Sequence, residues 1–379
     1  MSADPIQAQC IVSSSPLFRH AAFLLLAIAL GLLLLAHGGC THSTGPDTSK
    51  GKHPRSYFWM MDTISQSPNP KGLPEVGHYL NAFWGMGDTL VYAVGEDVVG
   101  GYNALWKYDG LHWNRVKLLS REGGPINTNI ELLAIRGFAP NDIYAFGNTY
   151  SNYTGSWVYT PAILHYDGIE WREVSFPKGE RILTAIAPKP TQINVGGLNG
   201  VFYSYNGFTW SLDTIRYSYR KDLPIFTGMI GPSSDGGTLI QTQQYDRETG
   251  MTYCQFLKYK NKQVTLIDSA RNLFSWGGLF WQSPSGTIYS SGYHGVYRLN
   301  GEKWEQILSS EVIIGIAGTS DNHIFAVGEN KVYFYDGTSW EVIYTQPGSP
   351  FAFSRAWCTE RQVFIACNDG RRVIVFRAR

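Results

Sequence analysis

Three acidic residues follow predicted strands and could reach one face of a repeated fold: Glu96, Asp97 and Glu329. A glycosidase uses two facing carboxylates, one as general acid and the other as base or nucleophile. Acids that follow strands are more often solvated loop residues, because a charged carboxylate gains from contact with water. A glycan-active hydrolase or lyase, with its site in a central depression, is therefore the alternative function rather than the preferred one.

Other catalytic and metal-binding patterns do not appear in the sequence. The arginines are scattered and do not recur at strand starts, which argues against the arginine cluster of a sialidase. No Ser-His-Asp elbow, phosphate-binding loop or dinucleotide motif occurs. No Cys-x-x-Cys or His-x-x-x-His spacing occurs either, so we expect no metal and no cofactor. We expect Cys254, Cys358 and Cys367 to be buried free thiols.

A repeated motif is the strongest signal in the chain: an aromatic or apolar residue, Asp or Asn, Gly, and Trp three positions after the Gly. Asp-Gly and Asn-Gly favour two-residue hairpin turns, because both residues tolerate positive φ. The motif could be a calcium or carbohydrate site, but five copies favour a turn with a Trp that packs between repeats. The copies are Tyr108-Asp109-Gly110-x-x-Trp113, Tyr166-Asp167-Gly168-x-x-Trp171, Tyr205-Asn206-Gly207-x-x-Trp210, Leu299-Asn300-Gly301-x-x-Trp304 and Tyr335-Asp336-Gly337-x-x-Trp340.

Each copy lies in a unit of four short strands, which is the blade of a β-propeller. The sequence predicts an all-β, seven-bladed β-propeller of four-stranded blades over residues 56–379. The last blade lacks a fourth strand, and Tyr57–Ile64 matches one, so we expect the N-terminal strand to complete it and remove a free sheet edge. The predicted blades are 78–118, 129–176, 181–216, 224–268, 272–309, 311–345, and 350–379 together with 56–65.

The repeats resemble a family of bacterial secreted and lipoprotein β-propellers, whose pattern is Asn-Asp-Ile-x-Ala-Val-Gly followed by Tyr-Asp-Gly-x-x-Trp. The matching stretches are Asn141–Gly147 and Tyr166–Trp171. The motif is also distantly similar to the Asp-box of sialidase-like propellers, with Asp directly before Gly rather than two positions earlier. The resemblance implies a propeller fold and an exported protein, and it implies almost nothing about activity.

The N-terminal segment is predicted to direct export. Ala21–Ala36 is an apolar run after Arg19, too short for a typical membrane-spanning helix and typical of a signal peptide. Cys40 follows Gly-Gly, so residues 1–39 resemble a lipoprotein signal with lipid attached at Cys40; an ordinary cleaved signal and an uncleaved anchor stay open. Residues 40–55 are predicted to be a flexible tether. We expect an outer-membrane or cell-surface lipoprotein, otherwise a periplasmic or secreted protein.

Extra sequence is predicted to collect on one face of the propeller. The second-to-third-strand loops Glu96–Asn103, Asn148–Pro161 and Gln244–Thr252 are expanded, as are the links Ser120–Asn129 and Tyr217–Pro224. Tyr, Trp and Arg give large contact area at low entropic cost, so these loops predict a binding surface, although the aromatic residues could also simply pack the loops. The candidate ligand-binding residues are Tyr102, Tyr150, Tyr153, Trp157, Tyr159, Tyr217, Tyr219, Arg220 and Tyr245.

These loops predict a non-catalytic binding or scaffold module, with an envelope protein or a glycan as the ligand. A net charge of +1 gives no general attraction to nucleic acid or to acidic membranes. Contact with the membrane is expected through the lipid anchor only, and we expect a monomer.

Overall fold

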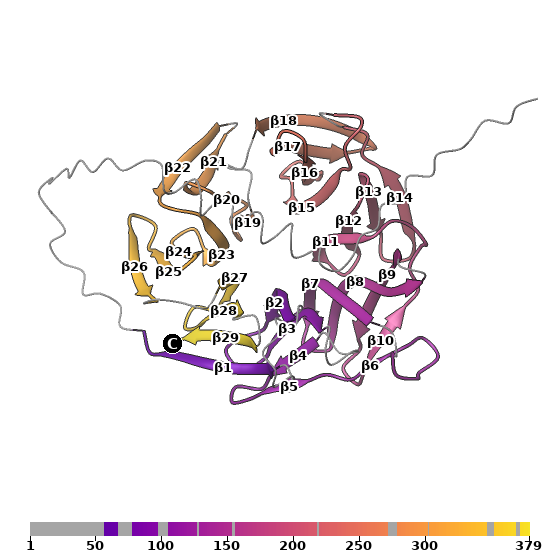
Figure 1. Cartoon of the computed structure of the whole chain (residues 1–379), viewed down its shortest axis with the longest axis horizontal. Coiled ribbons are helices and arrows are strands. Elements are labelled where there is room, and N and C mark those ends of the chain that lie inside the picture. The colour runs from indigo at the N-terminus through magenta and orange to yellow at the C-terminus, as the bar shows by residue number, and fades with distance from the viewer. Residues whose placement is uncertain are drawn as a thin grey trace, which may run out of the picture. The chain divides into compact units, whose positions relative to one another are not determined.

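The computed structural model describes residues 57–66, 78–97, 105–126, 129–153, 156–217, 220–271, 279–301, 303–346, 352–368 and 372–379. The predicted signal peptide, Cys40 and the tether lie outside these residues. The described residues form strands and turns (Figure 1), and no helix among them is long and apolar enough to cross a membrane. Residues 150–158 belong to one compact unit; residues 55–149 and 159–379 form the other, which is an all-β propeller.

Four of the sheets have four antiparallel strands in chain order. Their strands are β11 (Ile182–Lys189), β12 (Gln192–Gly197), β13 (Val201–Tyr205) and β14 (Trp210–Thr214); β15 (Phe226–Pro232), β16 (Thr238–Asp246), β17 (Met251–Lys260) and β18 (Gln263–Arg271); β19 (Phe280–Gln282), β20 (Ile288–Gly292), β21 (Gly295–Asn300) and β22 (Lys303–Ser309); and β23 (Ile313–Ser320), β24 (His323–Gly328), β25 (Lys331–Tyr335) and β26 (Trp340–Thr345).

A fifth four-stranded sheet joins the two ends of the described chain. Its order is β1 (Trp59–Gln66), β29 (Arg372–Ala378), β28 (Val363–Asn368) and β27 (Ala352–Cys358). β1 lies beside β29 in Figure 1 and pairs with it from Trp59 opposite Ala378 to Gln66 opposite Arg372. This is the N-terminal closing strand that the sequence predicts.

The remaining strands form one nine-stranded sheet, so the prediction of seven separate four-stranded blades is wrong. Its order is β5-β4-β3-β7-β8-β9-β10-β6, with β2 paired to β3. Glu96 of β3 pairs with Glu131 of β7, and the link strand β6 pairs with β10, so the predicted blades 78–118 and 129–176 merge. The strands are β2 (His78–Gly85), β3 (Val91–Asp97), β4 (Leu105–Tyr108), β5 (Trp113–Arg115), β6 (Leu118–Leu119), β7 (Asn129–Ala139), β8 (Asp142–Tyr153), β9 (Ser156–Tyr166) and β10 (Trp171–Val174).

The first strands of successive units contact one another in turn: β2 contacts β7, then β11, β15, β19, β23 and β27 follow, and β27 contacts β2. The glycine that follows Ala-Val or Ala-Phe in a second strand lets the backbone of the first strand approach closely. A Cβ on Gly95 would lie 1.7 Å from the carbonyl oxygen of Tyr79, and one on Gly147 would lie 1.9 Å from that of Glu131. The repeated Ala-Val-Gly and Ala-Phe-Gly endings are therefore a packing requirement.

The Asp-Gly-x-x-Trp motif of residues 109–113 forms a hairpin turn, and its Trp side chain packs between neighbouring sheets. Asp109 Oδ1 accepts hydrogen bonds from the amides of Leu111 and His112 at 2.9 and 2.8 Å. The indole of Trp113 packs edge-on against Phe364 of the neighbouring sheet, with ring centroids 6.2 Å apart. In this copy the Asp side chain thus fixes the turn, and the Trp side chain makes the contact between sheets.

Candidate functional site

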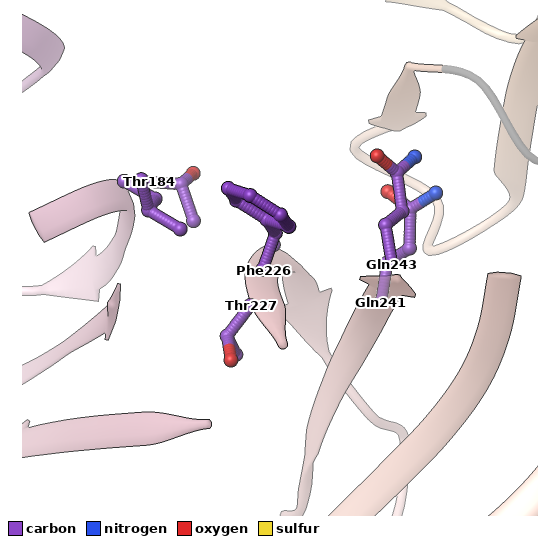
Figure 2. A pocket seen from close by; sticks show the side chains of 7 residues that line it. Thr184, Phe226, Thr227, Gln241 and Gln243 are labelled. Atoms are coloured by element: carbon purple, nitrogen blue, oxygen red, sulfur yellow. The ribbon is translucent and has the colours of Figure 1, made fainter. Parts of the chain in front are cut away.

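A shallow hollow of about 220 Å³ opens between β11 and the β15–β16 pair of the next sheet. Figure 2 shows the phenyl ring of Phe226 between Thr184 and the amides of Gln241 and Gln243. The other lining residues are Leu183, Thr227 and Gly228. The hollow is smaller than the roughly 300–1,000 Å³ of a typical small-molecule site. It therefore suits one side chain or one sugar ring rather than a whole cofactor.

Strand register determines which side chains face this hollow. Phe226 pairs with Gln243, and Gly228 pairs with Gln241. Paired residues point to the same side of a sheet, so both glutamines and the phenyl ring share one face. Gly228 leaves space there, since a Cβ at that position would lie 3.4 Å from Gln241 Oε1. Because Gly228 has no side chain, the space beside the Gln241 amide stays open.

The lining residues are neutral, and this limits the chemistry of the hollow. Glutamine amides both donate and accept hydrogen bonds, and the threonine hydroxyl does the same. Phe226 is 39% exposed, so its ring face is accessible to a ligand. No lining residue titrates near neutral pH, so the hollow supplies no general acid or base. Its chemistry is recognition of peptide groups or sugar hydroxyls.

Arg220, a predicted ligand residue, holds the link 217–224 against the end of β16. Its Nη1 donates to Asp246 Oδ2 at 2.9 Å, and its Nε donates to Asp222 Oδ1 at 2.9 Å. These two carboxylates, Asp222 foremost, raise the pKa of Arg220. Gln244 Nε2 also donates to the carbonyls of Arg220 and Leu223 at 2.6 and 3.0 Å. Arg220 therefore positions the loop beside the hollow.

The predicted tyrosines of the propeller differ in exposure. Tyr217 packs on the apolar cluster between the β11–β14 and β15–β18 sheets. Tyr159 lies under the guanidinium of Arg181, whose Cζ is 4.2 Å from the ring centroid, and Arg181 pairs with Glu131 at 2.6 Å. Tyr245 is 41% exposed at the end of β16. Tyr245 is thus the predicted tyrosine that the structure describes as accessible beside the hollow.

The remaining predicted residues lie elsewhere or are not described. In the unit containing residues 150–158, Tyr150 is buried and packs edge-on against Trp157, with centroids 5.5 Å apart. Tyr153 ends β8, and its side chain lies outside the described part of the structure. Tyr102 and Tyr219 also fall outside the described residues.

Two of the predicted insertions are longer strands rather than loops. β8 continues to Tyr153 and β9 starts at Ser156. β16 and β17 continue to Asp246 and Met251, where Asp246 Oδ1 accepts the amide of Glu248 at 2.9 Å. The expanded loops predicted at Asn148–Pro161 and about Gln244–Thr252 are therefore largely strand, because backbone pairing extends these hairpins.

The candidate carboxylates do not line the hollow. Glu96 lies at the end of β3, beside Glu131, and Glu329 is exposed between β24 and β25. The side chain of Asp97 is outside the described residues. Among the described residues, no group of three His, Cys, Asp or Glu side chains could hold a metal ion. Cys254, Cys358 and Cys367 are buried thiols that form no disulfide.

Sequence reasoning missed the hollow and two inner-strand arginines. Arg136 Nη1 donates to the Ile135 carbonyl at 2.7 Å, and Arg355 Nε donates to the Asn81 carbonyl at 3.2 Å. Neither guanidinium has a carboxylate partner among the described residues, and burial lowers the pKa of both. A usable signal for the hollow was Gln241-Thr242-Gln243-Gln244, where other second strands have Ala-Val-Gly.

Solved propeller structures resemble this chain, although no protein-family model and no curated protein matches it. A structure of YCF48 bound to D1 peptide aligns with a TM-score of 0.55 and 14% identity, covering 86% of this chain and 97% of that one. YCF48 from Cyanidioschyzon merolae aligns with a TM-score of 0.48 and 16% identity over 84% and 98%. The WD40 propeller of Doa1 aligns at 0.49 and 11% over 84% and 97%. The alignment with the first of these structures, at a TM-score of 0.55, shows the class of fold, a β-propeller.

Proposed function

We propose that this protein is a non-catalytic binding or scaffold module of the cell envelope, which uses the face that carries the hollow. The main support for this proposal is the hollow itself, which is lined by two side-chain amides, a threonine hydroxyl and an accessible phenyl ring. Such a surface forms hydrogen bonds and apolar contacts without supplying a nucleophile or a general base. The glycan-active enzyme draws no support from this site, because no carboxylate lines it.

The ligand we favour is an extended segment of an envelope protein. Side-chain amides can pair with both the N–H and the C=O groups of a peptide, and Phe226 and Tyr245 can contact an apolar side chain. The similar propeller structure of YCF48 bound to D1 peptide supports peptide binding as a use of this fold. A glycan would use the same hydrogen-bonding groups, so it is the second outcome to test.

Export and attachment complete the proposal. Residues 1–39 act as a lipoprotein signal, Cys40 carries the lipid, and residues 40–55 connect the lipid to the propeller. The support is the sequence alone: an apolar run of signal length, then Gly-Gly-Cys. Palmitate labelling of the parent and of Cys40→Ala in cells tests this step, and equal labelling of the two contradicts it.

A binding screen with a matched pair of variants tests the ligand proposal. The mature protein is screened against arrayed envelope peptides and arrayed glycans, beside Gln241→Ala/Gln243→Ala. Loss of two hydrogen-bonding amides should weaken a bound peptide by about 1–3 kcal/mol. The control is Gln263→Ala, which changes the exposed first residue of β18 in the same sheet. Retention that survives the double substitution, or is lost equally in the control, contradicts the proposed site.

A further inference from the structure

Three of the repeated hairpins expose a large apolar side chain at the tip. The residue after the turn glycine is Leu111, Ile169 or Phe208, and these side chains are 76%, 86% and 90% exposed. Folding gains nothing from such exposure, since the turn is already fixed by the Asp or Asn side chain. The corresponding residues in two other hairpins, Lys262 and Thr338, are polar and exposed.

The three tips lie on one face of the propeller. Each turn glycine packs on the turn between the first two strands of its own unit: Gly110 on Thr89, Gly168 on Asn141 and Gly207 on Thr191. The hollow lies at the opposite ends of these strands, because Thr184 is at the start of β11 and Thr191 follows its end. The tips belong to neighbouring units, as β2 contacts β7 and β7 contacts β11. They therefore form an apolar arc on the face away from the hollow.

The N-terminal strand enters the propeller on this same face. Phe58 and Arg379 exchange backbone hydrogen bonds of 3.0 and 3.3 Å where the third and fourth strands of their sheet meet. In the next unit, Asp109 and His112 face each other at the same point, next to the hairpin tip. Phe58 is 64% exposed and extends the arc of apolar side chains. The chain before Phe58 is the predicted tether from Cys40, and residues 40–55 extended at about 3.4 Å each span at most about 50 Å. A lipid at Cys40 would keep this face close to the bilayer.

We propose that the arc of Phe58, Leu111, Ile169 and Phe208 inserts into the surface of the bilayer to which Cys40 is anchored. This inference rests on the anchor in the proposed function. Exposed apolar side chains that enter the bilayer add a contact to that of the lipid at Cys40 and orient the propeller on the membrane. The hollow then faces away from the membrane, towards its ligand.

The charges beside the tips indicate a shallow insertion into neutral lipid. The amides of the turn lower the pKa of Asp109 and Asp167, so both carboxylates stay ionised at neutral pH. Ionised carboxylates remain at the level of the headgroups, while the apolar tips reach below them. Anionic lipid should therefore not strengthen the contact, and phosphatidylethanolamine with phosphatidylcholine is the matching surface.

Vesicle flotation of the mature chain, residues 40–379, tests the contact without its lipid, because the apolar run Ala21–Ala36 would itself bind vesicles. The Cys40→Ala chain is floated with neutral phosphatidylethanolamine–phosphatidylcholine vesicles, beside the same chain with Leu111→Ser, Ile169→Ser and Phe208→Ser. The tip substitutions should lower the partition coefficient by about tenfold or more. A control chain carries Leu212→Ser, Leu266→Ser and Val342→Ser, which remove exposed apolar side chains from outer strands, and its partitioning should match the parent. Equal flotation of all three chains overturns the proposal, as does binding that depends on anionic lipid.

A depth measurement on the lipidated mature chain separates the arc from the anchor. A spin label at Ile169→Cys should be relaxed by lipid-soluble oxygen more than by aqueous nickel, and a label at Thr338→Cys should show the reverse. If the protein is labelled with palmitate but the spin labels at positions 169 and 338 are equally accessible to aqueous nickel, the lipid anchor at Cys40 is supported and the membrane contact of the arc is refuted. If the tip substitutions instead abolish a dimer and the depth of the spin label does not change, the arc binds a second copy of the chain. That result would also refute insertion of the arc into the bilayer. Peptide retention measured in parallel reports on the hollow independently.

Discussion

Replacing Trp59 by alanine tests how much the closing strand contributes to the propeller. The Trp59 ring stacks on Phe376 with centroids 5.0 Å apart and lies 4.7 Å from the ring of Tyr344. It therefore joins β1 both to its own sheet and to the last strand of the preceding one. Truncating a large aromatic residue costs about 3–5 kcal/mol. Trp59 is half-buried, so we take the lower end of that range.

The size of the domain converts this cost into a melting shift. At about 2.1 cal/mol/K of unfolding entropy per residue, a domain of about 320 residues loses about 1.5 °C per kcal/mol. Trp59→Ala should therefore melt about 4–5 °C below the parent in circular dichroism at a fixed heating rate. Phe58→Ala is the matched control, because Phe58 is the next residue and is 64% exposed. Its melting temperature should stay within about 1 °C of the parent. Equal shifts in the two variants would refute the closing role of the Trp59 side chain.

Three further predictions follow from ionisable groups. The pKa of Asp109 and of Asp167 is lower in the folded chain, so the stabilisation from these carboxylates holds at neutral pH and is lost as pH falls through the folded pKa. The double variant Asp109→Asn/Asp167→Asn should therefore show a smaller change in melting temperature between about pH 5 and 2 than the parent. An equal dependence of melting temperature on pH in the two proteins contradicts this prediction. Burial raises the pKa of Cys254 to about 12, so the thiol should react with iodoacetamide only after unfolding; labelling of the native chain would be the contrary result. The Arg136→Met and Arg355→Met variants each remove a buried guanidinium that has no carboxylate partner among the described residues. Since burying such a charge costs free energy, each variant should melt no lower than the parent. A melting temperature several degrees lower would show that the hydrogen bonds to backbone carbonyls outweigh the cost of burying the charge.

The repeated local signals predicted most of the architecture because they act within a few residues. Asp109-Gly110 makes a turn, and Tyr57–Ile64 has the pattern of a fourth strand, whatever lies further away. The fusion of two predicted blades depends instead on two pairings between residues far apart in the sequence: Glu96 with Glu131, and β6 with β10. The leucines of β6, just before the link Ser120–Asn129, are buried, so packing draws this part of the chain into the sheet.

The hollow could not be predicted because it depends on register and on bulges. A shift of one residue in the pairing of Phe226 with Gln243 would turn both glutamines to the other face. The sequence identified aromatic residues near this region by composition, and packing partly buries Tyr217 and leaves Tyr245 exposed. Tyrosine content alone does not distinguish these two outcomes.

Photocrosslinking from the hollow in living cells tests the central claim, that this face binds a partner. Benzoylphenylalanine in place of Phe226 keeps an aromatic ring at the same position, and Leu212, exposed on β14, is the control position. We predict a discrete crosslinked product from position 226 that disappears with Gln241→Ala/Gln243→Ala. The absence of a product at 226, or the same product from 212, would contradict the claim.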